Sequence, residues 1–174
     1  MKAERAIQSR SMHRVALSDD LDGIVAIYND TISSRMATAD TEPVIVASRE
    51  RWFEEHASLQ RPLWVIELDG KIVAWLSYSN FYGRPAYAGT AELSIYIHGD
   101  YRRRGLGCYL LKKAIAHAPE IGIHTLLGFI FGHNRPSLKL FERFGFRRYG
   151  EMPGVAVLDG VQRDLVILGL KTNF

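Results

Sequence analysis

The sequence predicts an α/β fold of the α+β kind, in which a mixed and mostly antiparallel sheet carries helices on both faces. Segments with helical spacing of apolar residues alternate along the chain with short apolar runs that are typical of strands. Asp69-Gly70 and Asp159-Gly160 each join two such runs, and Asp-Gly is a strong signal for a tight hairpin. A chain of 174 residues with 47% hydrophobic content suits one domain of this kind.

The first half of the chain begins with a short strand near residues 13–17. A helix over residues 19–32 follows, because apolar side chains recur there every three or four positions, and Ser18 or Asp19 is expected to cap it. Residues 33–43 have the composition of a loop, and Ser48 is expected to cap a second helix over residues 49–59. Residues 63–81 then form the first hairpin.

The second half alternates between strands and helices. Residues 82–89 form a loop, residues 90–99 a strand, and residues 105–118 a helix with one apolar face. A buried strand over residues 123–131 leads into a helix from Pro136 to Phe144. Two strands over residues 146–158 and 161–170 close the chain as a second hairpin.

Composition narrows the class of protein further. Residues 1–12 are polar and are expected to be a short leader, with a single domain over residues 13–174. No apolar run approaches the ~20 residues of a membrane span, so no membrane partner is expected. One cysteine cannot form an internal disulfide, which favours a reducing, cytoplasmic location. The six histidines lack metal-binding spacing, and no metal is assigned.

The stretch "YRRRGLG", residues 101–107, combines three arginines with two glycines between a predicted strand and a predicted helix. It lacks the Lys and Ser or Thr of a Walker loop and the third glycine of a dinucleotide fingerprint. Glycines let the backbone N–H groups of residues 103–108 converge at the positive end of the helix, where a pyrophosphate can bind. A surface turn with solvated arginines is the alternative interpretation.

The arginine-glycine stretch and a second motif farther along the chain are similar to those of the GNAT superfamily of acetyl-CoA-dependent acetyltransferases. Arg102, Gly105 and Gly107 match the family pattern of Arg or Gln, two residues, Gly, one residue, and Gly or Ala. The segment "GHNRPSLKLFERFGF" follows one helix and one strand later. The resemblance covers about residues 13–170 and implies a twisted sheet of about six or seven strands with splayed central strands. Five further segments, "AIYND", "RERWFEEH", "LSYSNF", "GTAELSIYIHGDYRRRGLG" and "EMPGVAV", resemble the phosphinothricin N-acetyltransferase branch.

The resemblance implies that acetyl-CoA is the acetyl donor and that Glu92 is the general base that removes a proton from the amine. Partial burial would raise the pKa of Glu92 towards working pH; an ordinary strand glutamate is the alternative. The residues that the resemblance assigns to acetyl-CoA are Ile95, Tyr96, Ile97, Arg102, Arg103, Arg104, Gly105, Leu106, Gly107, Cys108, Asn134, Ser137 and Phe141. The edge of the strand at Ile95–Ile97 would hold the pantetheine arm like an added strand, with a backbone N–H near Ile95 polarising the carbonyl.

One position departs from the family. Phe141 stands where many relatives carry a tyrosine or histidine as the acid for the thiolate, and it cannot donate a proton. Water or a nearby hydroxyl such as that of Tyr109 would then serve, or the step needs no dedicated acid. Cys108 at a helix start is a conceivable nucleophile, but packing is the expected role.

The acceptor is expected to be a small primary amine or amino acid, larger and less polar than phosphinothricin. Family residues for the acceptor are replaced here by Ala39, Tyr82 and Ala88. The residues expected to line the acceptor pocket are Tyr78, Phe81, Tyr82, Arg84 and Tyr87; the alternative is that these aromatics are core or dimer contacts. A homodimer is expected from the resemblance. Two other functions stay open at this point: a protein or peptide N-terminal acetyltransferase, and a nucleic-acid-binding module that uses the arginine clusters.

Overall fold

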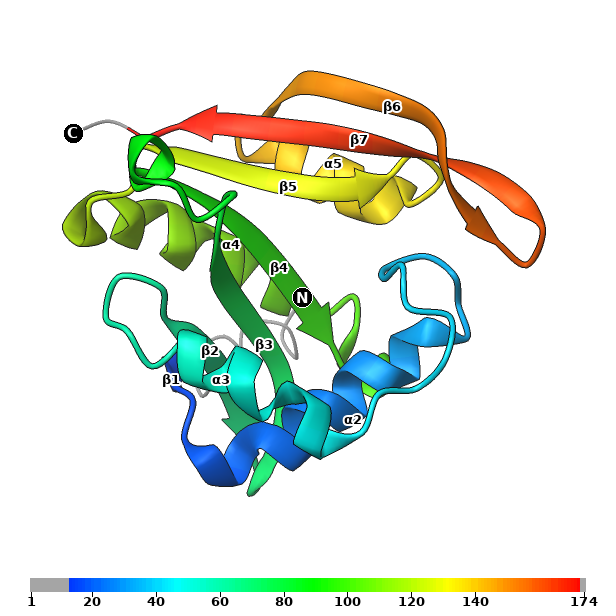
Figure 1. Cartoon of the computed structure of the whole chain (residues 1–174). Helices are drawn as coiled ribbons and strands as arrows, with labels where there is room; N and C mark the ends of the chain where they lie inside the picture. Colours follow the sequence, from blue (N-terminus) through cyan, green and yellow to red (C-terminus); the bar gives the residue numbers. More distant parts are fainter. Residues whose placement is uncertain (1–12, 173–174) are drawn as a thin grey trace.

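The computed structural model describes residues 13–172 and contains one seven-stranded sheet, in the order β1-β2-β3-β4-β5-β7-β6 (Figure 1). The predicted leader at residues 1–12 lies outside the described residues. The strands are β1 (His13–Val15), β2 (Leu63–Leu68), β3 (Lys71–Asn80), β4 (Thr90–Ile97), β5 (Thr125–Phe131), β6 (Arg147–Leu158) and β7 (Val161–Lys171). Every neighbouring pair is antiparallel except β4 and β5. The predicted fold class is therefore confirmed.

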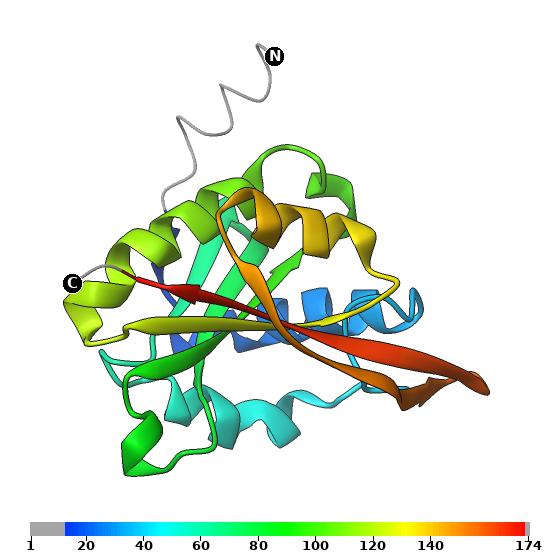
Figure 2. The same cartoon turned by 90° about the horizontal axis from the view of Figure 1, so that it is seen from above.

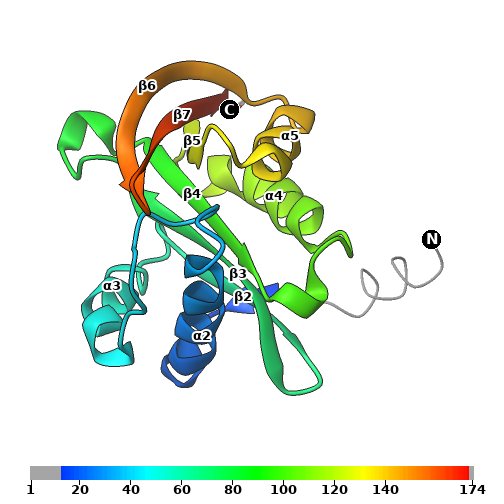
Figure 3. The same ribbon diagram turned by 90° about the vertical axis from the view of Figure 1, so that its right-hand side faces the viewer.

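Helices cover both faces of the sheet, as Figures 2 and 3 show. On one face lie α2 (Leu21–Ile32) and α3 (Glu50–Glu55), and on the other lie α4 (Leu106–His117) and α5 (Arg135–Arg143). Because side chains alternate across a strand, each face of the sheet can bury its own apolar layer. The larger core forms under α4 and α5, and a smaller one under α2 and α3.

Strand β4 is the centre of this arrangement. Its odd-numbered residues Leu93, Ile95 and Ile97 pack in the core under α4. Its even-numbered positions turn to the opposite face, where Tyr96 joins the apolar cluster of α2 and α3. Glu92, on the same face as Tyr96, is thereby directed away from the main core.

The two central strands separate along their length. β4 and β5 pair in parallel at Thr90↔Thr125, Ala91↔Leu126 and Glu92↔Leu127, and no pair follows Glu92. The remaining part of β4 keeps its partners on β3 alone. The splay predicted from the family resemblance is confirmed, and Glu92 lies at the point where it opens.

The helix starts differ from the prediction. Neither Ser18 nor Asp19 caps α2: a 3₁₀ turn over Ser18–Asp20 precedes the helix, and the Asp20 carboxylate accepts from the Leu17 N–H at 2.7 Å. Ser48 lies inside a second 3₁₀ turn, Val46–Arg49, where its hydroxyl donates to the Ile45 carbonyl. The second helix is accordingly shorter than expected. Within residues 13–172 no helix is long and apolar enough to cross a membrane.

Candidate active site

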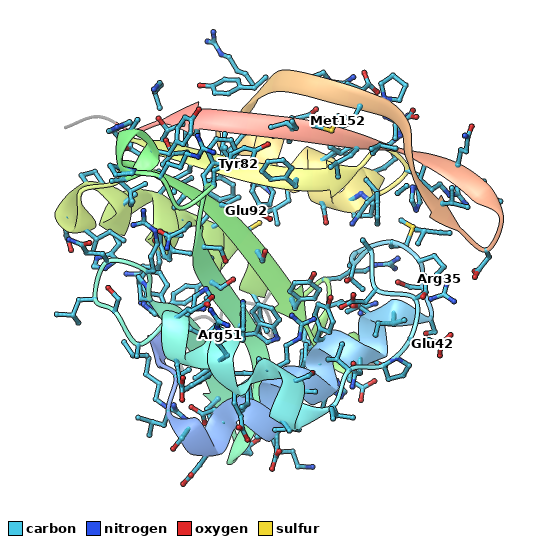
Figure 4. All side chains as sticks on the ribbon, viewed as in Figure 1. Arg35, Glu42, Arg51, Tyr82, Glu92 and Met152 are labelled. Carbon is cyan, nitrogen blue, oxygen red and sulfur yellow. The ribbon has the colours of Figure 1, made fainter. Side chains whose placement is uncertain are left out.

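Glu92 is half-buried on β4 at the opening of the splay (Figure 4). Its direct neighbours are Ser79 on β3 and Leu127 on β5. Burial raises the pKa of its carboxyl above the usual value for glutamate, because the surroundings disfavour the charged form. A carboxylate with a raised pKa at the wall of a cavity is suited to accept a proton.

A cavity of about 410 Å³ extends from Glu92 into the space between β4 and β5. It brings together six of the predicted site residues, which come from β4, from α5 and from the residue that caps α5: Glu92, Ile95, Tyr96, Asn134, Ser137 and Phe141. Ala39 and other residues of the loop after α2 form another wall, and Phe129 and Phe131 line it from β5. Ile97 does not line the cavity; its carbonyl accepts from Arg102 Nε at 3.1 Å.

A second cavity of about 180 Å³ lies between the sheet and the helices α2 and α3. Its walls include four aromatic side chains, Tyr28, Trp52, Trp75 and Tyr96. Ser94 and Tyr96 line both cavities, so the two spaces adjoin at β4 on the same face as Glu92. The sheet face here is polar at Ser77, Ser79 and Ser94 and aromatic at its far end.

The arginine-glycine loop joins β4 to α4. Arg103 and Gly105 have φ values of 60° and 85°, a left-handed conformation that glycine adopts readily. No side chain caps the N-terminus of α4, so its first N–H groups point to solvent or to a ligand. Among the residues described, Arg102 lies near Asp30 and Arg104 stacks over Tyr101, whereas Arg103 is exposed and has no ion-pair partner.

Gly107 has a packing role that the sequence did not indicate. It is buried in the first turn of α4, and a Cβ there would lie 3.1 Å from Leu140 Cδ2 and 3.4 Å from Ile97 Cδ1. The missing side chain therefore allows α4 to approach α5 and β4. A branched substitution at Gly107 would disturb this packing as well as any phosphate site.

Asn134 connects α5 to the loop after α2. Its side-chain oxygen accepts from Ser137 N–H at 3.2 Å, and its amide nitrogen donates to the Met36 carbonyl at 2.9 Å. The same loop is fixed to the β6–β7 hairpin by an ion pair between Arg35 and Asp159 at 2.9 Å. In Figure 4, Arg35 lies on the loop that faces the tip of this hairpin.

Tyr78 does not lie where the sequence predicts it. Instead of lining the acceptor pocket it is fully buried under α4, where its hydroxyl donates to the Ala114 carbonyl at 2.8 Å. The strand's alternation explains this, since Tyr78 points to the opposite face from Ser77 and Ser79. Tyr78 lines neither cavity.

Three of the other predicted acceptor residues, Phe81, Tyr82 and Tyr87, form an aromatic group beside the larger cavity. Phe81 packs against Tyr82, Tyr87 and Phe129, with ring centroids 4.6, 5.3 and 6.3 Å away. Of these rings, only that of Phe129 lines the cavity. Tyr82 and Tyr87 are exposed, as is Arg84. The loop over residues 81–89 therefore contacts the cavity wall only indirectly, because Phe81 packs on Phe129. The sequence did not predict Phe129 as a site residue.

The Tyr109 hydroxyl, considered as an alternative acid, and the Cys108 thiol, considered as a nucleophile, both lie away from the site. The Tyr109 hydroxyl is 3.0 Å from His13 Nδ1, and Tyr109 lines neither cavity. Cys108 is half-exposed at the start of α4 and also lines neither cavity. Ser137 is the hydroxyl that α5 brings to the cavity beside Phe141.

The polar residues that surround Glu92 on its face of the sheet were not predicted from the sequence. Ser79 and Ser94 follow from strand alternation once the register of β3 and β4 is known, but register was not predictable from local pattern. His56, at the end of α3, lies 3.2 Å from the Ser79 hydroxyl through its Nε2. No spacing in the sequence relates His56 to Ser79.

The unpaired edge of β4, the cavity beyond it and the free N–H groups of α4 together fit an elongated ligand with a phosphate at one end. A family model described as "Acetyltransferase (GNAT) family" matches residues 24–146. Bacillus subtilis YwnH, provisionally named a phosphinothricin acetyltransferase, is 55% identical over 161 residues, which are 92% of this chain and 98% of that protein.

Two further relatives agree with this match. The L-methionine sulfoximine/L-methionine sulfone acetyltransferase of Pseudomonas aeruginosa is 35% identical over 155 residues, covering 88% of this chain and 90% of that protein. The structure of yncA from Salmonella typhimurium, provisionally named an acetyltransferase and solved with its cofactor acetyl-CoA, superposes with a TM-score of 0.89 at 28% identity, covering 95% of each chain. The chain belongs to the GNAT acetyltransferase family, in its phosphinothricin acetyltransferase-like branch, and is an acetyl-CoA-dependent N-acetyltransferase.

Proposed function

We propose that this enzyme acetylates the primary amine of a small amino-acid-like acceptor by direct attack, with Glu92 as the general base. The observation that carries the proposal is the position of Glu92. Its carboxyl lies on the cavity wall where β4 and β5 separate, and burial raises its pKa. An ammonium group must lose a proton before its nitrogen can attack, and a positioned carboxylate is a suitable acceptor for it.

Acetyl-CoA supplies an acetyl group that its thioester already activates for transfer. This chain's own residues would bind and orient it: the unpaired edge of β4 at Ile95 and Tyr96, and the N–H groups at the start of α4 with Arg103 beside them. Phe141 packs against β5 next to Gly128 and forms an apolar wall of the cavity. Ser137 lines the same cavity beside Phe141 and is the hydroxyl that we assign to supply a proton to the leaving thiolate.

The acceptor would bind on the face of β4 that carries Glu92. The smaller cavity supports this, because it adjoins the larger one at Ser94 and Tyr96 and has aromatic walls at Trp52 and Trp75. Aromatic and apolar walls favour an acceptor larger and less polar than phosphinothricin. Arg49 also lines this cavity and carries a positive charge that suits an acceptor carboxylate, although Asp40 already pairs with it at 2.8 Å.

A small acceptor is favoured over a protein or peptide. An extended peptide would need an open groove between the loop after α2 and the closing hairpin. The Arg35–Asp159 ion pair joins these two segments. His133 Nε2 also donates to the Arg35 carbonyl at 2.7 Å. These contacts leave a compact site.

The test is Glu92→Gln, which keeps the shape of the side chain and removes the proton acceptor. Turnover should fall by about two orders of magnitude or more, whereas acetyl-CoA affinity should barely change. Thiol release would be measured with L-methionine sulfone, L-methionine sulfoximine, phosphinothricin, L-methionine and L-phenylalanine as acceptors. An unchanged rate in the variant at every pH would contradict the role of Glu92, and a clear preference for phosphinothricin would contradict the acceptor class.

We further propose that the enzyme is a homodimer and that it works in the cytoplasm. The exposed rings of Tyr82 and Tyr87, beside the site, are candidates for the contact between two copies. Light scattering at two protein concentrations, with Tyr82→Ser compared to the wild type, tests this assembly.

A further inference from the structure

His56 is a buried histidine that the mechanism above does not use. It lies at the C-terminal end of α3 and is 6% exposed. Its Nδ1 is 2.7 Å from the Trp52 carbonyl, and its Nε2 is 3.2 Å from the Ser79 hydroxyl. Burial lowers the pKa of its imidazole, so the ring is held neutral.

These two contacts determine which nitrogen carries the proton. A carbonyl oxygen can only accept, so Nδ1 must donate its hydrogen to Trp52. In a neutral imidazole the other nitrogen then has a lone pair and no hydrogen. The Ser79 hydroxyl must therefore donate its only hydrogen to Nε2, which leaves its oxygen as a pure acceptor towards the cavity.

Ser79 lies directly opposite Glu92. The two residues are cross-strand partners on β3 and β4, so their side chains are neighbours on one face of the sheet. Ser79 lines the smaller cavity and Glu92 the larger one, and the two cavities adjoin at Ser94, two residues after Glu92 on the same face of the sheet. The pair presents two hydrogen-bond acceptors, one ionised and one neutral, and no donor from Ser79.

We propose that Ser79 binds the acceptor amine together with Glu92, and that His56 is the positioning residue that keeps the Ser79 oxygen an acceptor. This rests on the proposed function, because it assumes that the amine approaches Glu92. Two acceptors side by side select a group with two N–H bonds to donate. Once Glu92 has taken one proton, the neutral primary amine keeps two N–H bonds. It can donate one to the Ser79 oxygen and the other to the second oxygen of the protonated Glu92 carboxyl. Holding these two bonds turns the new lone pair away from Glu92, towards the splay between β4 and β5.

The geometry therefore makes the site selective for primary amines. A neutral secondary amine has one N–H left and can satisfy only one of the two acceptors. Losing one such hydrogen bond leaves a polar group without a partner and reduces binding by about tenfold. The selectivity should depend on Ser79 and, through the hydrogen bond, on His56.

The experiment compares L-methionine sulfone and L-phenylalanine with their N-methyl analogues in the wild type and in four variants. Ser79→Ala and His56→Phe should each lower kcat/KM for the primary amine about tenfold and change it little for the N-methyl compound. His56→Gln should retain most of the selectivity, because its side-chain oxygen can accept the Ser79 hydrogen. Ser48→Ala, at an exposed hydroxyl that lines neither cavity, should leave the ratio between primary and N-methyl acceptors within twofold of the wild type.

A second readout does not depend on the acceptor. The ¹⁵N shifts of His56 should report a protonated Nδ1 and an unprotonated Nε2, and the Nε2 signal should move in Ser79→Ala. A protonated Nε2 would overturn the inference, because Ser79 would then receive a hydrogen and could donate its own to the cavity. If a folded Ser79→Ala enzyme keeps the wild-type ratio of kcat/KM between primary and N-methyl acceptors, the inference is also overturned. This holds even if Glu92→Gln is impaired as proposed. A fully active Glu92→Gln enzyme would instead contradict the proposed function.

Discussion

Arg103 is predicted to contribute more to acetyl-CoA affinity than either neighbouring arginine. Arg102 already donates to the Ile97 carbonyl at 3.1 Å and lies 3.9 Å from Asp30. Arg104 stacks over the Tyr101 ring at 5.1 Å. Arg103 is exposed next to the first turn of α4 and has no ion-pair partner among the residues described. It can therefore meet a phosphate without first giving up another contact.

The size of the effect follows from this position. A hydrogen bond to a charged group is worth about 1.5–3 kcal/mol, and solvent exposure puts Arg103 near the lower end of that range. Arg103→Ala should therefore weaken binding by about tenfold, since about 1.4 kcal/mol corresponds to a factor of ten. The difference from wild type should shrink at high salt, because screening acts on exposed charges.

Calorimetry with acetyl-CoA at low and high salt measures both quantities. Arg51→Ala is the control: Arg51 is also exposed, but it lies on α3 on the other face of the sheet (Figure 4), where it pairs with Glu55. The control should bind acetyl-CoA as the wild type does. Normal affinity in a folded Arg103→Ala protein would refute the assignment of the phosphate site to this loop.

Three further predictions follow from the site and the core. Activity should be lost as the pH falls through the raised pKa of Glu92, because a base must be ionised, and Glu92→Gln should abolish this acid limb of the kcat/KM profile. Tyr78→Phe should lower the free energy of unfolding by about 0.5–1.5 kcal/mol through loss of the bond to Ala114, with acceptor KM unchanged; a threefold change in KM would contradict its place in the core. Gly107→Val should lower the free energy of unfolding by about 1–3 kcal/mol in urea titrations, because its side chain would crowd Leu140, and wild-type stability would contradict this packing.

Local pattern was sufficient for most of the fold. The two Asp-Gly hairpins form as predicted, with φ values of 50° and 74° at Asp69 and Gly70. The order of strands and helices was also predictable, because the spacing of apolar residues along the chain differs between a helix and a strand with one buried face. Helix starts were less predictable: no side chain caps α2, and the Asp20 carboxylate instead accepts from Leu17 at the 3₁₀ turn before the helix.

The sequence by itself determined the chemistry at the centre of the protein: a carboxylate at Glu92 on a strand, an arginine-glycine loop before a helix, and the spacing to Asn134 that places the chain in its family. Only the tertiary structure decided which other side chains face that carboxylate. Tyr78 and Ser79 are adjacent in sequence, yet strand alternation buries one under α4 and turns the other towards Glu92 and His56. Gly107 likewise acquires its packing role from α5, which follows about thirty residues later. Such contacts depend on strand register and on the packing of distant elements, and no local pattern encodes either.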